Sequence, residues 1–407
     1  MRTPVWDAII VGARIAGTAT AIGLARRGLR VLMLDRAAFP SDTLCTHYFQ
    51  RDVAIQFARL GVLDEIEATG PPPLRKVRTV APDDGIEFTE TMQQLGGVDA
   101  GYCVRRSVLD DILVRAARAA GVEVREHTTI TGLIWEDGQV GGVEAEETNK
   151  RGYKEPARVV IGADGRHSRV ARWTGAHTYE RAPALAPHYY AYFRGVAGDG
   201  NAVEWFHTAR RRYALLPTND GLSCVSVALP QHEIGPYRDA IERSLLADLR
   251  LVPELADRLA GAERVGPVRG TGDIDSHLRV PAGPGWLLVG DAGAHIHPVK
   301  TRGIGLALHD ADVLAEALSA SLAGERAPDE ALADYHRLRD VERERLYQEA
   351  LAAAWMIGRP LPSEVLEAWA ALAQQPDAAT RWVNGRVRDD QELQRIIERS
   401  DAPQVQS

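Results

Sequence analysis

Residues 7–17 read Asp-Ala-Ile-Ile-Val-Gly-Ala-Arg-Ile-Ala-Gly, and this stretch decides the expected fold. Residues 7–11 form a short, apolar, β-branched run, which is typical of a buried parallel strand. A helix of small residues should follow as far as Arg27, with Gly28 as its C-terminal stop. A second strand over 31–34 should end at Asp35. The spacing predicts a βαβ unit whose helix N-terminus binds the pyrophosphate of a dinucleotide.

Individual residues of this unit have different predicted roles in dinucleotide binding. Gly12 allows the tight turn, Gly17 lets the helix pack on the strand, and Asp35 stands where an acceptor for a ribose hydroxyl belongs. Arg14 occupies the middle position that usually carries glycine. A side chain pointing away from the phosphates is tolerated there, and a guanidinium could also reach a phosphate.

Two further motifs follow, far along the chain. Residues 159–165 form a strand that runs into Gly-Ala-Asp-Gly, with Asp164 and Gly165 at its end. Residues 286–289 form another apolar strand that stops at Gly290-Asp291, and Pro298 then leads to the helix opening Gly303-Ile304-Gly305. A helix that opens in this way offers free backbone N–H groups to an anion or to an electron-rich ring edge.

In this order the three motifs resemble the FAD-dependent class A monooxygenases of the para-hydroxybenzoate hydroxylase fold, a group related to flavin halogenases and geranylgeranyl reductases. The resemblance covers residues 1–180 and 280–320. It implies that Asp35 holds the adenosine ribose, that Asp291 holds the ribityl chain and that Pro298 lies beside the reactive ring. Arg106 matches an arginine that contacts the cofactor, with Arg105 as its neighbouring competitor. The FAD contacts that the resemblance implies are Gly12, Arg14, Ala16, Gly17, Asp35, Arg36, Arg106, Asp164, Gly165, Gly290, Asp291, Gly303, Ile304 and Gly305.

The expected fold class is α/β with an α+β insert: a Rossmann-like FAD-binding domain of the glutathione-reductase and para-hydroxybenzoate-hydroxylase type. We expect this domain over residues 1–75, 98–176 and 284–325, and a mixed-sheet substrate domain over 76–97 and 177–283. The remainder, 326–407, should be helical, with a disordered tail from about Ser400. A helix over 107–120 should open with a Ser-x-x-Asp cap at Ser107.

Composition narrows the function class. The chain has 407 residues, of which 45% are hydrophobic, and a net charge of −8 with acids and bases interleaved, so no nucleic-acid footprint is expected. Three cysteines cannot form a disulfide framework, no metal-ligand spacing is present, and no signal peptide or membrane span is visible. These features predict a cytoplasmic protein.

Candidate substrate residues follow from their place in the expected domains. Tyr190, Tyr192, Trp205 and Tyr213 are candidates to line an apolar substrate cavity, and plain core packing is the alternative for each. His47 lies on a segment expected to travel toward the flavin ring, where it would anchor substrate or relay a proton; a structural role is its alternative.

The resemblance implies that FAD, reduced by NADH or NADPH, reacts with molecular oxygen to give a C4a-hydroperoxide that hydroxylates or epoxidises a small organic substrate. An aromatic or polyketide-like secondary metabolite is expected, acted on by a monomer or homodimer. One alternative is reduction of C=C bonds, as in a geranylgeranyl reductase, and another is a flavoprotein without catalytic activity. A flavin halogenase should carry a Trp-x-Trp-x-x-Ile motif with a nearby lysine, and the sequence shows no such tryptophan pair.

Overall fold

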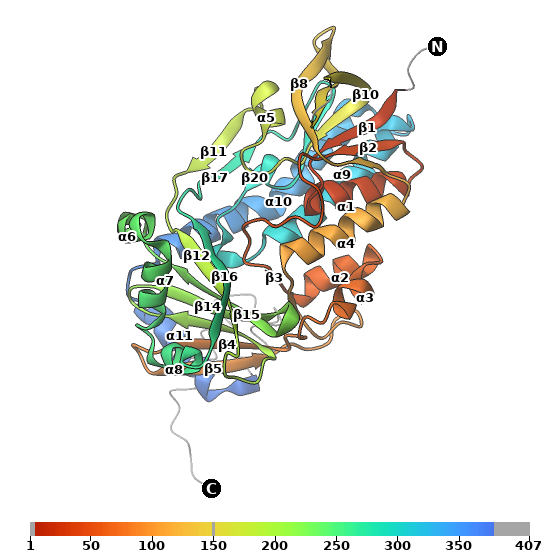
Figure 1. The fold of residues 1–407 in the computed structure, drawn as a ribbon. Helices are drawn as coiled ribbons and strands as arrows, with labels where there is room; N and C mark the ends of the chain where they lie inside the picture. Colours follow the sequence, from red (N-terminus) through yellow and green to blue (C-terminus); the bar gives the residue numbers. More distant parts are fainter. Residues whose placement is uncertain (1–4, 149–150, 378–407) are drawn as a thin grey trace.

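The computed structural model describes residues 5–148 and 151–377. Its first layer is a sheet of eight strands whose central members run parallel (Figure 1). The order is β18–β19–β10–β1–β2–β7, and the β8–β9 hairpin extends from the first half of β10. The strands are β1 (Trp6–Val11), β2 (Val31–Leu34), β7 (Glu123–Arg125), β8 (Thr128–Glu136), β9 (Gln139–Glu147), β10 (Tyr153–Gly162), β18 (Ala282–Gly283) and β19 (Trp286–Leu288).

Parallel pairing brings three distant motifs to one edge of this sheet. Val11 pairs with both Leu34 and Gly162, and Gly162 pairs with Leu288. The segments that follow β1, β2, β10 and β19 therefore leave the sheet side by side. The carboxyl ends of parallel strands are where α/β proteins bind their ligands.

Helices cover one face of the sheet. Apolar side chains of α1 and α9 pack on β1 and β2 in a single core, and Gly23 of α1 lies so close to α9 that an added Cβ would be 2.8 Å from Ala315 Cβ. The long helix α10 packs on α9 (Figure 1). The helices associated with this first sheet are α1 (Ile15–Ala25), α2 (Arg51–Arg59), α3 (Leu63–Ala68), α4 (Arg106–Ala119), α5 (Arg169–Trp173), α9 (Gly303–Leu322) and α10 (Pro328–Trp355).

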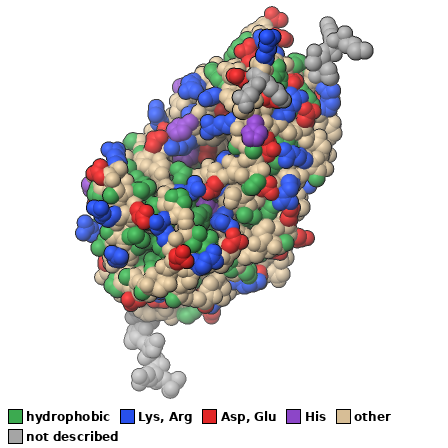
Figure 2. Space-filling model, viewed as in Figure 1, with side chains coloured by type: hydrophobic (Ala, Val, Ile, Leu, Met, Phe, Trp, Pro, Cys, Tyr) green, Lys and Arg blue, Asp and Glu red, His purple; other side chains and the backbone are tan. Residues whose placement is uncertain are grey.

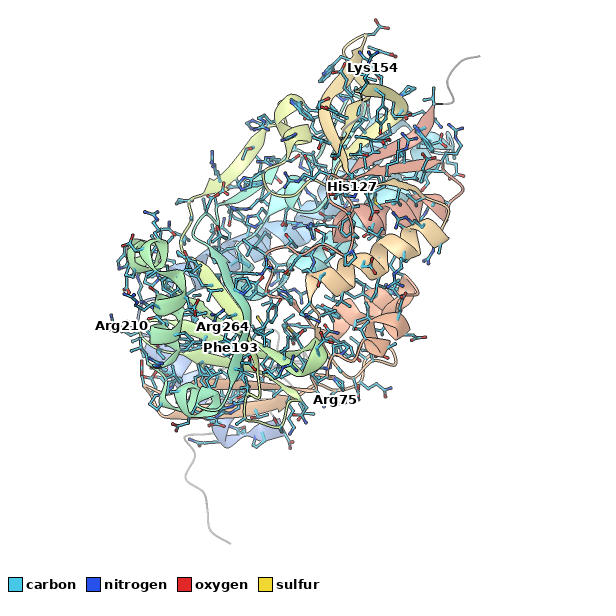
Figure 3. The ribbon with its side chains drawn as sticks, in the orientation of Figure 1. Arg75, His127, Lys154, Phe193, Arg210 and Arg264 are labelled. Atoms are coloured by element: carbon cyan, nitrogen blue, oxygen red, sulfur yellow. The ribbon has the colours of Figure 1, made fainter. Side chains whose placement is uncertain are left out.

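A second sheet of seven strands has the order β16–β12–β15–β14–β13–β4–β5, antiparallel except for the β13–β4 pair. Phe193 of β12 faces Arg264 of β16 in this register (Figure 3). Both faces of the sheet are buried: one packs on α6, α7 and α8, and the other faces the β3–β6 pair. The strands are β4 (Lys76–Ala81), β5 (Ile86–Thr91), β12 (His188–Arg194), β13 (Ala202–His207), β14 (Arg212–Thr218), β15 (Leu222–Ala228) and β16 (Glu263–Thr271).

Smaller elements complete the fold. The strands β11 (Thr178–Ala182), β17 (Ser276–Arg279) and β20 (Ala294–His295) form a third sheet, and β3 (Tyr48–Phe49) pairs with β6 (Tyr102–Cys103). The remaining helices are α6 (Gly235–Asp239), α7 (Ile241–Leu249), α8 (Pro253–Leu259) and α11 (Ser363–Gln374), with 3-10 turns η1 (Asn219–Gly221), η2 (Gln231–Glu233), η3 (Gly290–Ala292) and η4 (Pro298–Lys300).

This architecture confirms the expected fold class, a mixed α/β FAD-binding fold with a second sheet and C-terminal helices. The expected helical cap at Ser107 is wrong, because α4 begins one residue earlier at Arg106 and has no side-chain cap. The tail expected to be disordered from Ser400 lies outside the described residues. Among the residues described, no helix has both the length and the apolar character needed to cross a bilayer. Basic and acidic side chains are interspersed over the face in Figure 2.

Candidate functional site

A cavity of about 1020 Å³ lies along the edge where the parallel strands end. One part is lined by the turns after β1, β2 and β10, and another by β12 and β16 of the second sheet. The cavity therefore joins the nucleotide-binding edge of the first sheet to the inner face of the second. It is large enough for an extended ligand, since ordinary small-molecule sites span about 300–1,000 Å³.

The turn after β1 depends on two glycines. Gly12 has φ +109°, and a Cβ there would lie 2.5 Å from the carbonyl oxygen of Ala163. At Gly17 a Cβ would lie 1.9 Å from the carbonyl oxygen of Gly12. Gly12 and Ala16 line the cavity, whereas Gly17 serves the close approach of helix and strand.

Asp35 ties the end of β2 to this turn. Its carboxylate accepts hydrogen bonds from the backbone N–H of Ala13 at 2.7 Å and of Ala37 at 2.8 Å. Asp35 and Arg36 both line the cavity. The carboxylate is thus held in place by the backbone, and its remaining lone pairs can receive a ligand hydroxyl.

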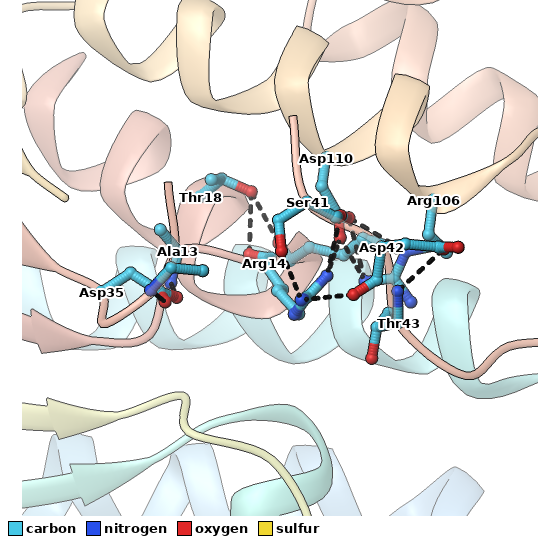
Figure 4. Close-up of polar contacts among 11 residues, drawn as sticks. Ala13, Arg14, Thr18, Asp35, Ser41, Asp42, Thr43, Arg106 and Asp110 are labelled. Carbon is cyan, nitrogen blue, oxygen red and sulfur yellow. Dashed lines mark hydrogen bonds and ion pairs between the residues drawn. The ribbon is translucent and has the colours of Figure 1, made fainter. Parts of the chain in front are cut away.

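Arg14 is fixed by protein groups (Figure 4). Its guanidinium donates to Asp110 Oδ2 at 2.6 Å, to the carbonyl oxygen of Asp42 at 3.0 Å and to Ser41 Oγ at 3.3 Å. The arginine lines the cavity while its donors hold the 41–42 loop against α4. Reaching a phosphate, the alternative for this side chain, would require some of these bonds to be given up.

Asp110 contacts two arginines of the cavity wall, a role that was not predicted from the sequence. Its carboxylate is fully buried and also accepts two hydrogen bonds from Arg106, at 2.9 and 3.0 Å. Arg106 lines the cavity, whereas Arg105 bonds to Asn219 and Asp220 near the second sheet. Asp110 therefore joins two cavity-lining arginines from different motifs (Figure 4).

The Asp-Gly motif after β10 begins a short helix. Asp164 accepts from Ser168 Oγ at 2.5 Å and from the Arg169 N–H at 2.6 Å, and burial raises the pKa of its carboxyl group. Gly165 has φ +77°, and both residues line the cavity. Their backbone geometry places the chain at the cavity wall, while the Asp164 side chain stabilises α5.

The third motif forms the far wall of the cavity. Gly290, at φ +61°, donates its N–H to Asp310 Oδ2 at 3.1 Å, and Asp310 is itself bonded to the buried Arg343 at 2.6 Å. Asp291 lies next to it, exposed and lining the cavity, as does Pro298.

The helix α9 begins beside this wall. Gly303 and Ile304 line the cavity, and a Cβ at Gly305 would lie 2.7 Å from Val53 Cγ2. Gly305 therefore serves the packing of α2 on α9, and Gly303 and Ile304 are the residues that reach the cavity.

These features fit an extended FAD. Two helices that begin at the cavity, α1 and α9, have no side-chain cap and no acidic residue in their first turns. Free N–H groups at a helix N-terminus favour a phosphate or an electron-rich ring edge. The turn at Gly12–Ala16 would hold the pyrophosphate, Asp291 the ribityl chain, and Gly303 and Ile304 the pyrimidine edge.

His47 does not line this cavity. Its side chain is completely buried and packs edge-on against Tyr190 and Tyr192, and Nε2 shares a hydrogen bond of 2.5 Å with the Tyr192 hydroxyl. Burial lowers the pKa of His47 to about 4. His47 therefore lies behind the tyrosine layer, a position that favours the structural alternative over direct contact with a ligand in the cavity.

Only Tyr190 of the four candidate aromatic residues lines the cavity. Tyr192 is turned toward His47, and Trp205 packs on Tyr48 with ring centroids 6.3 Å apart. Tyr213 lies on the opposite face of the second sheet, in the core beneath α6–α8. The contacts of these three residues fit the stated alternative, plain core packing, because a strand buried on both faces uses aromatic residues as core on either side.

Several lining residues carried no motif in the sequence. Near β8 and α5 the wall includes basic and aromatic side chains, namely Arg166, His167, Arg169, Arg172 and Trp173. At the other end it includes His188 and Thr301. Their nearness to the Asp-Gly and Gly-Ile-Gly motifs was the available signal. Within the described ranges, no three His, Cys, Asp or Glu side chains gather in a way that could hold a metal ion.

Comparison with known proteins agrees with this geometry. The family model described as FAD binding domain matches residues 5–350. A digeranylgeranylglycerophospholipid reductase of Methanosarcina acetivorans is 26% identical over 77% of this chain and 75% of its own. The ubiquinone hydroxylase UbiM of Neisseria meningitidis is 25% identical over 76% of this chain and 68% of its own.

A solved structure shares the whole fold. The myxobacterial chondrochloren halogenase CndH superposes with a TM-score of 0.80 at 23% identity, over 98% of this chain and 97% of the halogenase. At that identity the likeness concerns the fold. The matched range, 5–350, includes the three motifs that line the cavity. This chain belongs to the FAD binding domain family and is an FAD-dependent oxidoreductase.

Proposed function

We propose that the protein is a monooxygenase that uses FAD, reduced by NADH or NADPH, to insert one oxygen atom from O2 into a small organic substrate. The observation that carries this proposal is the cavity wall beyond Pro298. The lining residues from β12, 270–274 and 295–301 include no Asp, Glu, Lys or Arg. A wall of this kind favours an uncharged substrate and excludes water, which activated oxygen requires.

Two titratable groups in this wall, His188 and Tyr190, support the same conclusion. Burial lowers the pKa of His188 to about 4 and raises the pKa of the Tyr190 hydroxyl above its usual range. Both side chains are therefore neutral at pH 7. Neutral walls provide hydrogen bonds without attracting a hydration shell of the kind that surrounds a charge.

When bound, reduced FAD supplies the electrons that activate O2. The protein supplies the geometry: uncapped N–H groups at α1 and α9 for the two ends of the cofactor, and Pro298 and Tyr190 beside the substrate. An aromatic or polyketide-like compound, as found in secondary metabolism, fits a wall that includes the Tyr190 ring and has no Asp, Glu, Lys or Arg among its lining residues from β12, 270–274 and 295–301.

Reduction of a C=C bond is the second candidate, because digeranylgeranylglycerophospholipid reductases of several archaea are among the relatives. A halogenase is a weaker candidate, although a pyrrole-carrier-protein brominase of Pseudoalteromonas luteoviolacea is 24% identical over 78% of this chain. The residues that line the cavity include no lysine, and a flavin halogenase needs one.

The test is turnover of the FAD-loaded enzyme with NADPH or NADH under isotopically labelled O2, using a panel of phenols, polyketide aromatics and isoprenoid alkenes. We expect one labelled oxygen atom in the product and one equivalent of O2 consumed. Anaerobic saturation of an alkene, with no oxygen in any product, would replace the proposal with the reductase. Halogenation on addition of bromide would replace it with the third candidate.

A further inference from the structure

His188, which lines the cavity, and the buried His297 share one backbone carbonyl. The Nδ1 atom of His188 and the Nε2 atom of His297 each lie 3.2 Å from the carbonyl oxygen of Ala186. The two rings lie 5.6 Å apart between centroids. A carbonyl oxygen only accepts hydrogen bonds, so both of these ring nitrogens must carry a proton.

This requirement assigns the tautomers. His297 Nδ1 accepts the backbone N–H of Val299 at 3.3 Å, so both nitrogens of His297 are engaged within the protein. His188 differs, because its ring lines the cavity and, across the described chain, no residue is bonded to Nε2. Since a neutral imidazole carries one proton, which His188 places on Nδ1, its Nε2 is a bare acceptor at the cavity wall.

The residues around Nε2 of His188 determine which kind of ligand group can bind it. The neighbouring lining residues from 270–274 and 295–301 carry no ionised Asp, Glu, Lys or Arg side chain. Asp42 also lines the cavity, but its carboxylate is paired with Arg269 at 3.2 Å. A cationic donor would therefore meet no unpaired carboxylate beside this acceptor, whereas a neutral hydroxyl would meet an acceptor and an aromatic ring, that of Tyr190. Leaving such an acceptor unpaired when a ligand excludes water has a cost in free energy, so the site discriminates against a ligand without the hydroxyl.

We propose that Nε2 of His188 accepts a hydrogen bond from a neutral phenolic or enolic hydroxyl group of the substrate. This names the substrate class of the proposed function and rests on it for the place of the flavin ring. The imidazole is a much weaker base than a phenolate, so the proton stays on the substrate oxygen. The role of His188 is to bind and orient the hydroxyl, with the Ala186 carbonyl fixing its tautomer.

The experiment measures binding of matched pairs to the oxidised FAD-loaded protein by calorimetry and by change in flavin absorbance. The pairs are phenol and anisole, and 2-naphthol and 2-methoxynaphthalene. We expect the wild-type protein to bind the phenol of at least one pair about tenfold more tightly than its methyl ether. His188→Leu should bind both members alike, and His188→Gln, whose amide oxygen accepts, should restore part of the preference.

Tyr213→Phe serves as the control variant, because Tyr213 lies on the opposite face of the sheet. It should keep the wild-type preference. The inference is overturned if the wild-type protein binds phenols no better than ethers, if it binds neither, or if His188→Leu retains the preference. FAD content and circular dichroism confirm that each variant is folded. Binding requires no turnover, so a His188-dependent preference without oxygen consumption would contradict monooxygenation while supporting this assignment.

Discussion

Replacing Asp110 with asparagine should loosen the part of the cavity formed by two arginines. The Asp110 carboxylate is fully buried and accepts hydrogen bonds from Arg14 at 2.6 Å and from Arg106 at 2.9 and 3.0 Å. Asparagine keeps the shape but removes the charge, and its amide N–H groups would face guanidinium donors. Two cations would remain, one of them buried, without a compensating anion.

Removing one partner of a buried ion pair costs about 3–5 kcal/mol, because the remaining charge is left desolvated. Arg106 is only 9% exposed, so leaving its charge unpaired carries the full free-energy cost. The Arg14 side chain is 30% exposed and is partly hydrated, so its contribution is smaller. We therefore expect the free energy of unfolding of the apoprotein to fall by about 3 kcal/mol. Both arginines line the cavity, so the FAD dissociation constant should rise by at least about tenfold, equivalent to 1.4 kcal/mol.

The assays are urea denaturation of the apoprotein and titration with FAD followed by quenching of flavin fluorescence. Asp111→Asn is the matched control, since the neighbouring Asp111 bonds at 3.0 Å to Arg115, whose side chain is 51% exposed. Pairs of that kind contribute about 0–1 kcal/mol. If Asp110→Asn matches Asp111→Asn in both measurements, the linking role assigned to Asp110 is refuted.

Three further results are expected. Gly12→Ala should abolish FAD binding and lower the unfolding free energy more than the control variant Gly28→Ala. Both glycines have positive φ, but only at Gly12 would a Cβ lie 2.5 Å from a carbonyl oxygen. Equal effects of the two variants in denaturation and FAD titration would contradict this. Asp291→Ala should lose FAD on gel filtration, whereas full retention of flavin would oppose the ribityl contact. The folded pKa of His47 is about 4, below the unfolded value of 6.5, so the unfolded chain binds the proton first and stability should fall as pH drops from 6.5 toward 4. Denaturation curves at pH 7 and pH 5 measure this fall in the unfolding free energy. In His47→Asn the fall should be smaller than in the wild-type protein by about 2 kcal/mol. An equal fall in the two proteins would exclude the assignment.

The sequence predicted the parts of the site that depend on local geometry. A tight turn after a strand needs glycine, and strand, turn and helix follow one another in the chain, so residues 7–17 were sufficient to predict the edge at which the cavity lies. The same holds for Gly290 and Gly165, whose φ angles are +61° and +77°. Parallel pairing then brought these motifs together as expected.

Contacts between distant side chains could not be predicted in this way. Arg14 and Asp110 are 96 residues apart, and His47 and Tyr192 are 145 apart, so neither pairing leaves a local pattern. Asp110 lies three residues after Ser107, which imitates a helix cap, although its carboxylate serves the arginines.

The substrate wall was hard to predict for a different reason. Both faces of the second sheet are buried, so aromatic residues occur at adjacent and alternate positions of β12, and at Tyr213 of β14, without marking the cavity. Tyr190 and Tyr213 therefore look equivalent in the sequence, although the fold places them on opposite faces. The role proposed for His188 could not be predicted from the sequence, because it depends on the Ala186 carbonyl that fixes its tautomer.

The claim on which the other conclusions depend is that one FAD molecule lies along this cavity, from the Gly12 turn to the start of α9. The most direct measurement is titration of the purified, flavin-stripped protein with FAD, with bound flavin counted per chain by absorbance. We predict saturation at one FAD per chain in the wild-type protein and loss of binding in Gly12→Ala. A wild-type protein that is folded, stays colourless and takes up no flavin would contradict the account.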